Sequence, residues 1–152
     1  LPQMHAADVP VLLGTDGSAT GNDLDMWKQM RIAAILHRGV QLDPTLNPTE
    51  KVVRMVTREA AEALGIGDRF GSIENGKLAD LILIDLRSVH LVPMYDVFSH
   101  LVYAVGREDV STVIIHGEVV MRRRELLTID EAETVARTRE LATRFGEAMP
   151  LH

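Results

Sequence analysis

Apolar residues recur every three or four positions in two segments of the first 67 residues, a spacing typical of helices that bury one face. The first helix is predicted to run from a cap at Asn22 or Asp23 to about His37. Its apolar side would be formed by Leu24, Trp27, Met30, Ala34 and Ile35.

The second predicted helix begins at "NPTE", where Asn47 suits the cap and Pro48 suits the first helical position. Gly65 is expected to end it, because glycine readily adopts the left-handed conformation that follows many helices. Between these ends the helix would bury a stripe of Val53, Val56, Ala60 and Leu64.

The remaining apolar runs lack this helical period. The run from Val9 to Gly14 is short and bounded by Pro and Gly, which predicts a buried parallel strand. "FGSIENGKLADLILIDL" predicts a hairpin that turns at Asn75–Gly76, and "DVSTVIIHGEVVMRRREL" predicts another that turns at His116–Gly117. A charged helix from Ile129 to Gly146 should follow, with an inner side of Ala132, Val135, Ala136, Ala142 and Phe145.

Composition narrows the class of protein. The chain has 152 residues, 46% of them hydrophobic and 25% charged, with a net charge of −6, as in an ordinary globular domain. This acidic balance argues against a nucleic-acid partner, and the basic cluster Arg122–Arg124 is short enough to be a turn. There is no cysteine and no apolar run of membrane-spanning length, so we expect a cytoplasmic protein without a membrane partner.

Asp16 is the strongest candidate for chemistry. It lies in "GTDG", directly after the predicted strand and before a loop rich in Gly, Ser and Thr. An Asp before Gly at a strand end is a common turn-former, whose carboxylate accepts nearby backbone N–H bonds. The alternative is a carboxylate held at the strand end to do chemistry, which a short motif alone supports less well. These four residues alone leave both interpretations open.

Four stretches in the same order carry a family resemblance: "LGTDG", "NDLDMWKQMRIAAIL", "VVRMVTREAAEALG" and "GSIENGKLADLILIDL". They resemble the C-terminal part of the amidohydrolase superfamily, above all 5-methylthioadenosine/S-adenosylhomocysteine deaminases and s-triazine chlorohydrolases. The similarity extends from Val9 to about Glu133. Gly21 and Gln29 depart from this pattern, in which Ser and Glu are frequent at the two positions.

The resemblance implies an α/β fold: the C-terminal part of a metal-dependent (β/α)8 barrel hydrolase, joined to part of a small β-sandwich. Residues 1–67 would form the last barrel strand and its helices, residues 68–127 part of the sandwich, and residues 128–152 a C-terminal helix. The chain opens at Leu1 in a sequence that reads as the interior of a fold, so we expect a chain cut in mid-fold.

The resemblance also implies a role for Asp16, as metal ligand and as proton shuttle in hydrolytic deamination of an adenosine-like purine. The cofactor would be Zn²⁺, with another divalent metal such as Fe²⁺ as the alternative. A second alternative keeps the superfamily and changes the leaving group, which would be chloride or an amine lost from an s-triazine ring. The partners implied are a small-molecule substrate and a homo-oligomeric copy.

The remaining metal ligands are not evident in this chain. Relatives bind metal through an H-x-H pair and further histidines, and none of the six histidines here forms such a pair: His5, His37, His90, His100, His116 and His152. Zinc needs about four ligands. We therefore expect the missing N-terminal barrel segment to supply them and the isolated chain to be inactive. If the gene encodes these residues alone, a non-catalytic binding or assembly module is the alternative.

Overall fold

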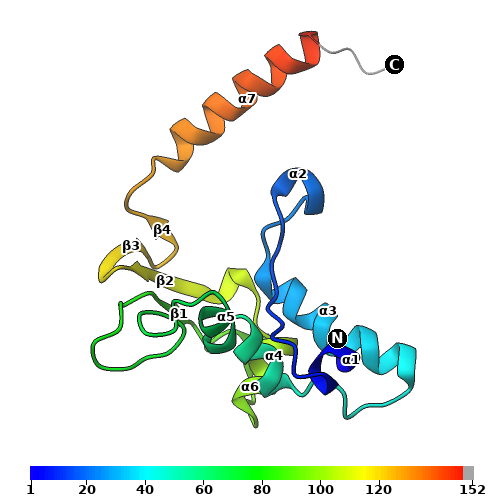
Figure 1. Cartoon of the computed structure of the whole chain (residues 1–152). Coiled ribbons are helices and arrows are strands. Elements are labelled where there is room, and N and C mark those ends of the chain that lie inside the picture. Colours follow the sequence, from blue (N-terminus) through cyan, green and yellow to red (C-terminus); the bar gives the residue numbers. More distant parts are fainter. Residues whose placement is uncertain (149–152) are drawn as a thin grey trace.

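A computed structural model describes the backbone of residues 1–148 and the side chains of residues 1–146. The fold is mixed, with helices in the first half, a small antiparallel sheet in the second and a last helix after it (Figure 1). The order is α1 (Pro2–Ala6), α2 (Ser18–Gly21), α3 (Met26–Gln41), α4 (Thr49–Met55), α5 (Arg58–Ala63), β1 (Leu81–Ile84), η1 (Val89–Leu91), α6 (Val97–Tyr103), η2 (Arg107–Asp109), β2 (Val110–Ile115), β3 (Glu118–Arg122), β4 (Glu125–Leu126) and α7 (Glu131–Ala148).

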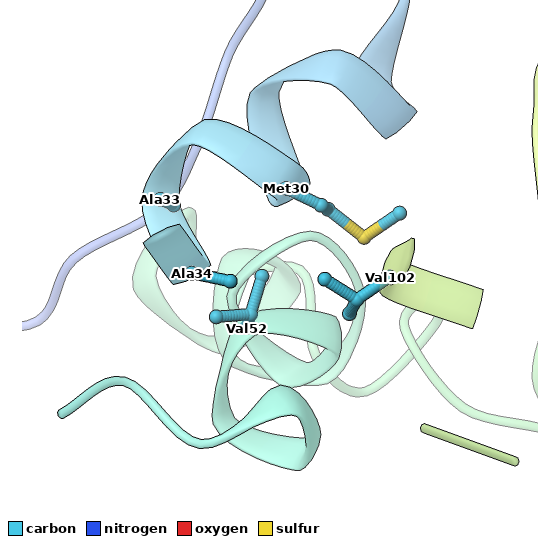
Figure 2. Close-up of a cluster of buried hydrophobic side chains, with 5 residues drawn as sticks. All are labelled: Met30, Ala33, Ala34, Val52 and Val102. Atoms are coloured by element: carbon cyan, nitrogen blue, oxygen red, sulfur yellow. The ribbon is translucent and has the colours of Figure 1, made fainter. Parts of the chain in front are cut away.

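The hydrophobic core lies where α3, α4 and α6 meet. Small side chains on α3 let the helices approach closely, and the cluster consists of Met30, Ala33, Ala34, Val52 and Val102 (Figure 2). Leu13 and Trp27 pack against this cluster and are partly buried. The core is therefore formed by segments on both sides of the loop that carries Asp16, and it holds the two ends of that loop.

The first predicted helix exists, but its start was placed too early. α3 begins at Met26, and its cap is Asp25, whose Oδ1 accepts hydrogen bonds from the backbone N–H groups of Trp27 at 2.9 Å and Lys28 at 3.3 Å. Neither Asn22 nor Asp23 caps it. The preceding residues are occupied by the short helix α2, which the apolar period could not reveal.

The second predicted helix is two helices, α4 and α5, separated at Val56 and Thr57. Asn47 does not cap α4. Its side chain is buried, and Nδ2 donates to the carbonyl of Ala33 at 2.9 Å, which connects the segment between α3 and α4 back to α3. Gly65 follows the second helix with φ of 72°, as predicted. The fully buried residues are Val52, Met55 and Ala61. Of the predicted stripe, Val53 and Val56 are partly buried against the core, whereas Leu64 is exposed.

The sheet has four antiparallel strands in the order β1-β2-β3-β4. Its central hairpin confirms the predicted turn, where His116 and Gly117 both have positive φ, 53° and 83°. The other predicted hairpin is wrong in its first half. Asn75–Gly76 does turn, with Gly76 at φ of 91°, but the residues before it form no strand and β1 pairs with β2 instead.

The predicted strand from Val9 to Gly14 is absent from the residues that the structure describes. The segment is an irregular coil whose Leu13 N–H donates to the carbonyl of Met55 at 3.3 Å. A parallel strand exists only beside neighbours that complete its hydrogen-bond ladder, and residues 1–148 provide no such neighbour. The barrel placement of residues 1–67, and the sandwich placement of residues 68–127, stay predictions.

The last helix, α7, projects away from the rest of the chain (Figure 1). The inner side predicted for it is wrong, because all five of its residues are exposed: Ala132, Val135, Ala136, Ala142 and Phe145. An amphipathic pattern predicts which residues share a side of a helix, whereas burial of that side requires an element for it to pack on. Across the described part of the chain, no helix is long and apolar enough to cross a membrane.

Replacing Met30 by alanine is expected to destabilise the fold by roughly 2–5 kcal/mol, because truncating a buried methionine leaves a cavity among closely packed helices. Met30 is 5% exposed in the centre of the cluster. Urea unfolding of the dilute chain, followed by the fluorescence of its single tryptophan, measures the change. Met94→Ala is the matched control, since Met94 is 44% exposed. Equal losses of unfolding free energy in the two variants would contradict the core described above.

Candidate functional site

Asp16 lies in a loop that stands out from the body of the molecule. Two extended stretches of chain carry the loop, and the short helix α2 forms its tip (Figure 1). Asp16 is exposed, as is every residue from there to Asn22. The hydrogen bonds of α2 are local, joining Thr20 and Gly21 to the carbonyl of Gly17, each at 3.0 Å. From Asp16 to Asn22 the loop is thus held by contacts within itself.

The backbone of Asp16 has φ of 55°, in the left-handed region that side chains other than Gly, Asn and Asp rarely adopt. A turn-forming Asp would accept backbone N–H bonds, as Asp43 does from Thr45 at 2.8 Å. In the part of the chain described, the Asp16 carboxylate accepts none; only its backbone carbonyl accepts, from the Thr15 hydroxyl at 3.1 Å. The Asp16 carboxylate is thus exposed, without the local hydrogen bonds that Asp43 makes.

The far end of the loop folds back on its beginning. Asn22 adopts φ of 55° after α2, where it ends this short helix rather than beginning the next. A Cβ atom added at Gly21 would lie 3.1 Å from the carbonyl oxygen of Thr15, a tight contact that would require a small shift of one of them. The glycine at this position therefore lets the chain pass close to the residue before Asp16.

The histidines do not gather around Asp16. His100 Nε2 bonds the carbonyl of Leu91 at 2.9 Å, a structural role as predicted, and His116 lies in the β2–β3 turn. His90 Nε2 is 3.2 Å from the buried carboxylate of Asp109, and His37 Nε2 is 3.4 Å from the N-terminal amine. His152 lies outside the described residues. The remaining histidine, His5, is in α1, and burial is the main cause that lowers its pKa.

Among residues 1–146, no three His, Asp or Glu side chains are close enough to hold a metal ion together. A zinc ion requires about four ligands. The side chains of residues 1–146 therefore do not form a complete zinc site. A groove of about 440 Å³ that includes His5, Asp8, Lys51 and Glu59 lies elsewhere, beside α1 and α5, and does not include Asp16.

Sequence reasoning missed one polar connection that involves this loop. Asp23 follows α2 and pairs with Lys28 of α3 and with Arg107 of η2, the latter at 3.0 Å. Arg107 is 84 residues from Asp23 along the chain. No local motif in the sequence signals a pair with this separation.

Comparison with known proteins places the chain in one family. The sequence profile of the amidohydrolase family matches residues 1–120. A 5-methylthioadenosine/S-adenosylhomocysteine deaminase of Syntrophobacter fumaroxidans is 47% identical over 142 residues, which are 93% of this chain and 32% of that protein. The enzyme of the same name from Desulforudis audaxviator is 49% identical over 142 residues, 93% of this chain and 33% of that protein.

Two solved structures share the fold. An adenosine deaminase of Xanthomonas campestris with bound zinc superposes with a TM-score of 0.88 at 43% identity, over 93% of this chain and 32% of that one. An atrazine chlorohydrolase of Arthrobacter aurescens in complex with zinc superposes with a TM-score of 0.81 at 29% identity, over 92% and 31% of the two chains. The chain thus spans about a third of the length of the relatives that it matches.

Proposed function

Because this chain belongs to the amidohydrolase family, we propose that it forms about a third of a zinc-dependent hydrolase that deaminates an adenosine-like purine, such as methylthioadenosine or S-adenosylhomocysteine. The proposed substrate class is supported by the 47% identity of this chain to a deaminase with those two substrates in its name. The identity to the triazine-acting relative is 29%, which supports the deaminase over the chlorohydrolase.

In this proposal Asp16 is the catalytic carboxylate that the chain contributes. Its side chain is exposed and free of the local hydrogen bonds that a turn-forming Asp would make. Such a carboxylate can accept a proton from the attacking water and deliver it to the leaving nitrogen. Zinc, when bound, supplies the Lewis acidity that makes water a nucleophile at neutral pH. Asp16 would be one of its ligands, and histidines outside this chain would be the others.

The rest of the protein would then pack against this chain as an N-terminal segment. Ile32, Ile35 and Leu36 on α3 are each about half exposed and, together with Lys28 and Arg31, line an open groove of about 400 Å³. An exposed apolar face of this kind marks an interaction site. Barrel neighbours beside Val9–Gly14 would complete the strand ladder that this segment lacks. The proposed protein is cytoplasmic and acts on a small molecule.

The test is expression of the complete gene with zinc, followed by measurement of the loss of adenine absorbance. We expect turnover of methylthioadenosine, S-adenosylhomocysteine or adenosine. Atrazine-like triazines and guanine, assayed in parallel, should not be converted at a comparable rate. Turnover of a triazine or of guanine without turnover of any adenosine compound would overturn the proposed substrate and leave the family unchanged.

A further inference from the structure

The Asp23–Arg107 ion pair joins the loop that carries Asp16 to η2, directly before β2. Arg107 Nη1 lies 3.0 Å from Asp23 Oδ1, while Lys28 bonds the other carboxylate oxygen. The hydrogen bond from Lys28 is the main cause that lowers the pKa of Asp23 below its usual value, so the carboxyl is ionised at neutral pH. The side chain of Asp23 is 18% exposed, less than that of either partner. Two basic residues, Lys28 and Arg107, thus contact the loop through the Asp23 carboxylate.

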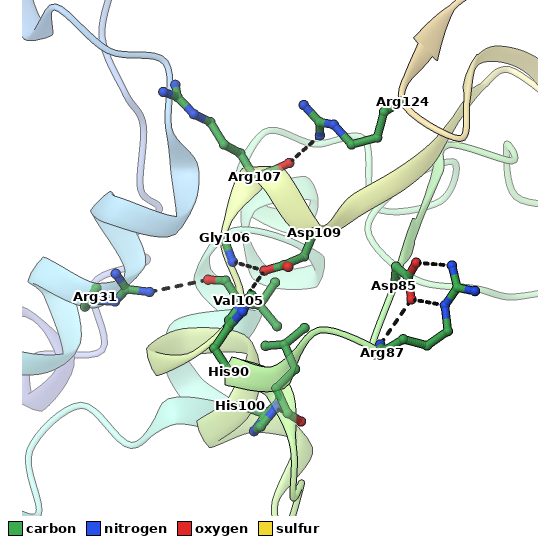
Figure 3. Close-up of polar contacts among 11 residues, drawn as sticks. Arg31, Asp85, Arg87, His90, His100, Val105, Gly106, Arg107, Asp109 and Arg124 are labelled. Atoms are coloured by element: carbon green, nitrogen blue, oxygen red, sulfur yellow. Dashed lines mark hydrogen bonds and ion pairs between the residues drawn. The ribbon is translucent and has the colours of Figure 1, made fainter.

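The arginine end of this pair is fixed in place. Gly106, just before Arg107, donates its N–H to Asp109 Oδ2 at 2.9 Å, and Asp109 is only 5% exposed (Figure 3). The carbonyl of Arg107 accepts from Arg124 Nη1 at 3.0 Å, which connects it to the end of β3 (Figure 3). The backbone of Arg107 is therefore held from two sides, and its side chain reaches out from a rigid base.

The helix that follows the loop is held to the same region. Arg31 of α3 donates to the carbonyls of Val102 and Val105, both at 3.3 Å. This contact orients α3 but lies beyond the loop. Between Asp16 and Asp25, Asp23 makes the contact that connects the loop to a distant element of the fold, across 84 residues.

We propose that Arg107 is a positioning residue for Asp16, acting through Asp23 to hold the loop in one orientation. The catalytic consequence rests on the function proposed above, whereas the loop restraint does not. Without Arg107, Asp23 still pairs with Lys28, which lies on the helix next to the loop and cannot connect it to the sheet. The loop would then sample more orientations, and the Asp16 carboxylate would spend less time at the reacting atoms.

Hydrogen exchange in the complete protein tests the restraint independently of activity. We expect Arg107→Ala to raise exchange of the backbone amides from Asp16 to Asp23 by about two- to fivefold, the scale of one exposed ion pair. Arg87→Ala is the matched control, because Arg87 is exposed and pairs only locally, with Asp85 two residues away. The Arg87→Ala variant should leave hydrogen exchange of the loop amides unchanged. Arg107→Lys should restore most of the protection, since a single nitrogen of Arg107 contacts Asp23.

Two results would overturn the proposal. One is unchanged loop exchange in Arg107→Ala. The other is an equal rise in β2 and β3, which would make Arg107 a residue of the sheet alone. If the deaminase assay succeeds, Arg107→Ala should also lower kcat two- to fivefold with KM little changed. A failed assay with the expected exchange pattern would reject the proposed function and keep the positioning role.

Discussion

Replacing Asp16 by asparagine in the complete protein is expected to lower kcat/KM for the adenosine-like substrate by about 10²–10⁴-fold, the usual contribution of a general base. Asparagine keeps the shape of the side chain and removes the charge that accepts a proton. Folding should persist, because asparagine tolerates the left-handed backbone that Asp16 adopts, with φ of 55°. The exposed carboxylate also makes no hydrogen bond within residues 1–148 that the change would break.

Asp8→Asn is the matched control. Asp8 is also exposed, has φ of 52° and lies eight residues earlier, so the substitution changes the same charge on the same backbone conformation. We expect near-normal activity for this variant and unchanged circular dichroism for both. Activity of Asp16→Asn within a few-fold of the unmodified protein would return Asp16 to the role of a turn-former.

Features set by neighbouring residues were predictable from the sequence. The turn at His116–Gly117 needs positive φ at two successive positions, and glycine after a residue that tolerates it is a local signal. The main body of α3 follows from its apolar period, and the end of α5 from Gly65. Asp16 was singled out from a signal of the same local kind, an acidic residue between an apolar run and a glycine, and its role stays a prediction.

Features that depend on distant partners were not predictable in this way. Asn47 has the chemistry of a cap, yet its amide bonds the carbonyl of Ala33, and only the packing of α3 makes that partner available. The Asp23–Arg107 pair has no local signature at all. The run from Val9 to Gly14 has the composition of a buried strand, but a strand forms only where neighbours complete its ladder. Each discrepancy arises because the partner, rather than the segment, decides the structure.

The same dependence on partners leads to a prediction for the 152-residue chain by itself. We expect no hydrolytic turnover and no stoichiometric tight zinc, because the side chains of residues 1–146 bring no three His, Asp or Glu groups together. Zinc content after dialysis, measured by elemental analysis, checks the binding. Co-expression with the N-terminal segment of the complete protein should restore both zinc and activity. Either property in the pure 152-residue chain would contradict the proposal that its metal ligands lie elsewhere.

The isolated chain should also self-associate as its concentration rises, through the groove formed by Ile32, Ile35 and Leu36. Light scattering during gel filtration measures the mass. Ile35→Lys should reduce association, because a charge in an apolar contact must be desolvated. Leu64→Lys, at a comparably exposed leucine directly after α5, is the control and should leave association unchanged. A monodisperse monomer at all concentrations, with a cooperative melt, would instead support a self-sufficient module that needs no N-terminal segment.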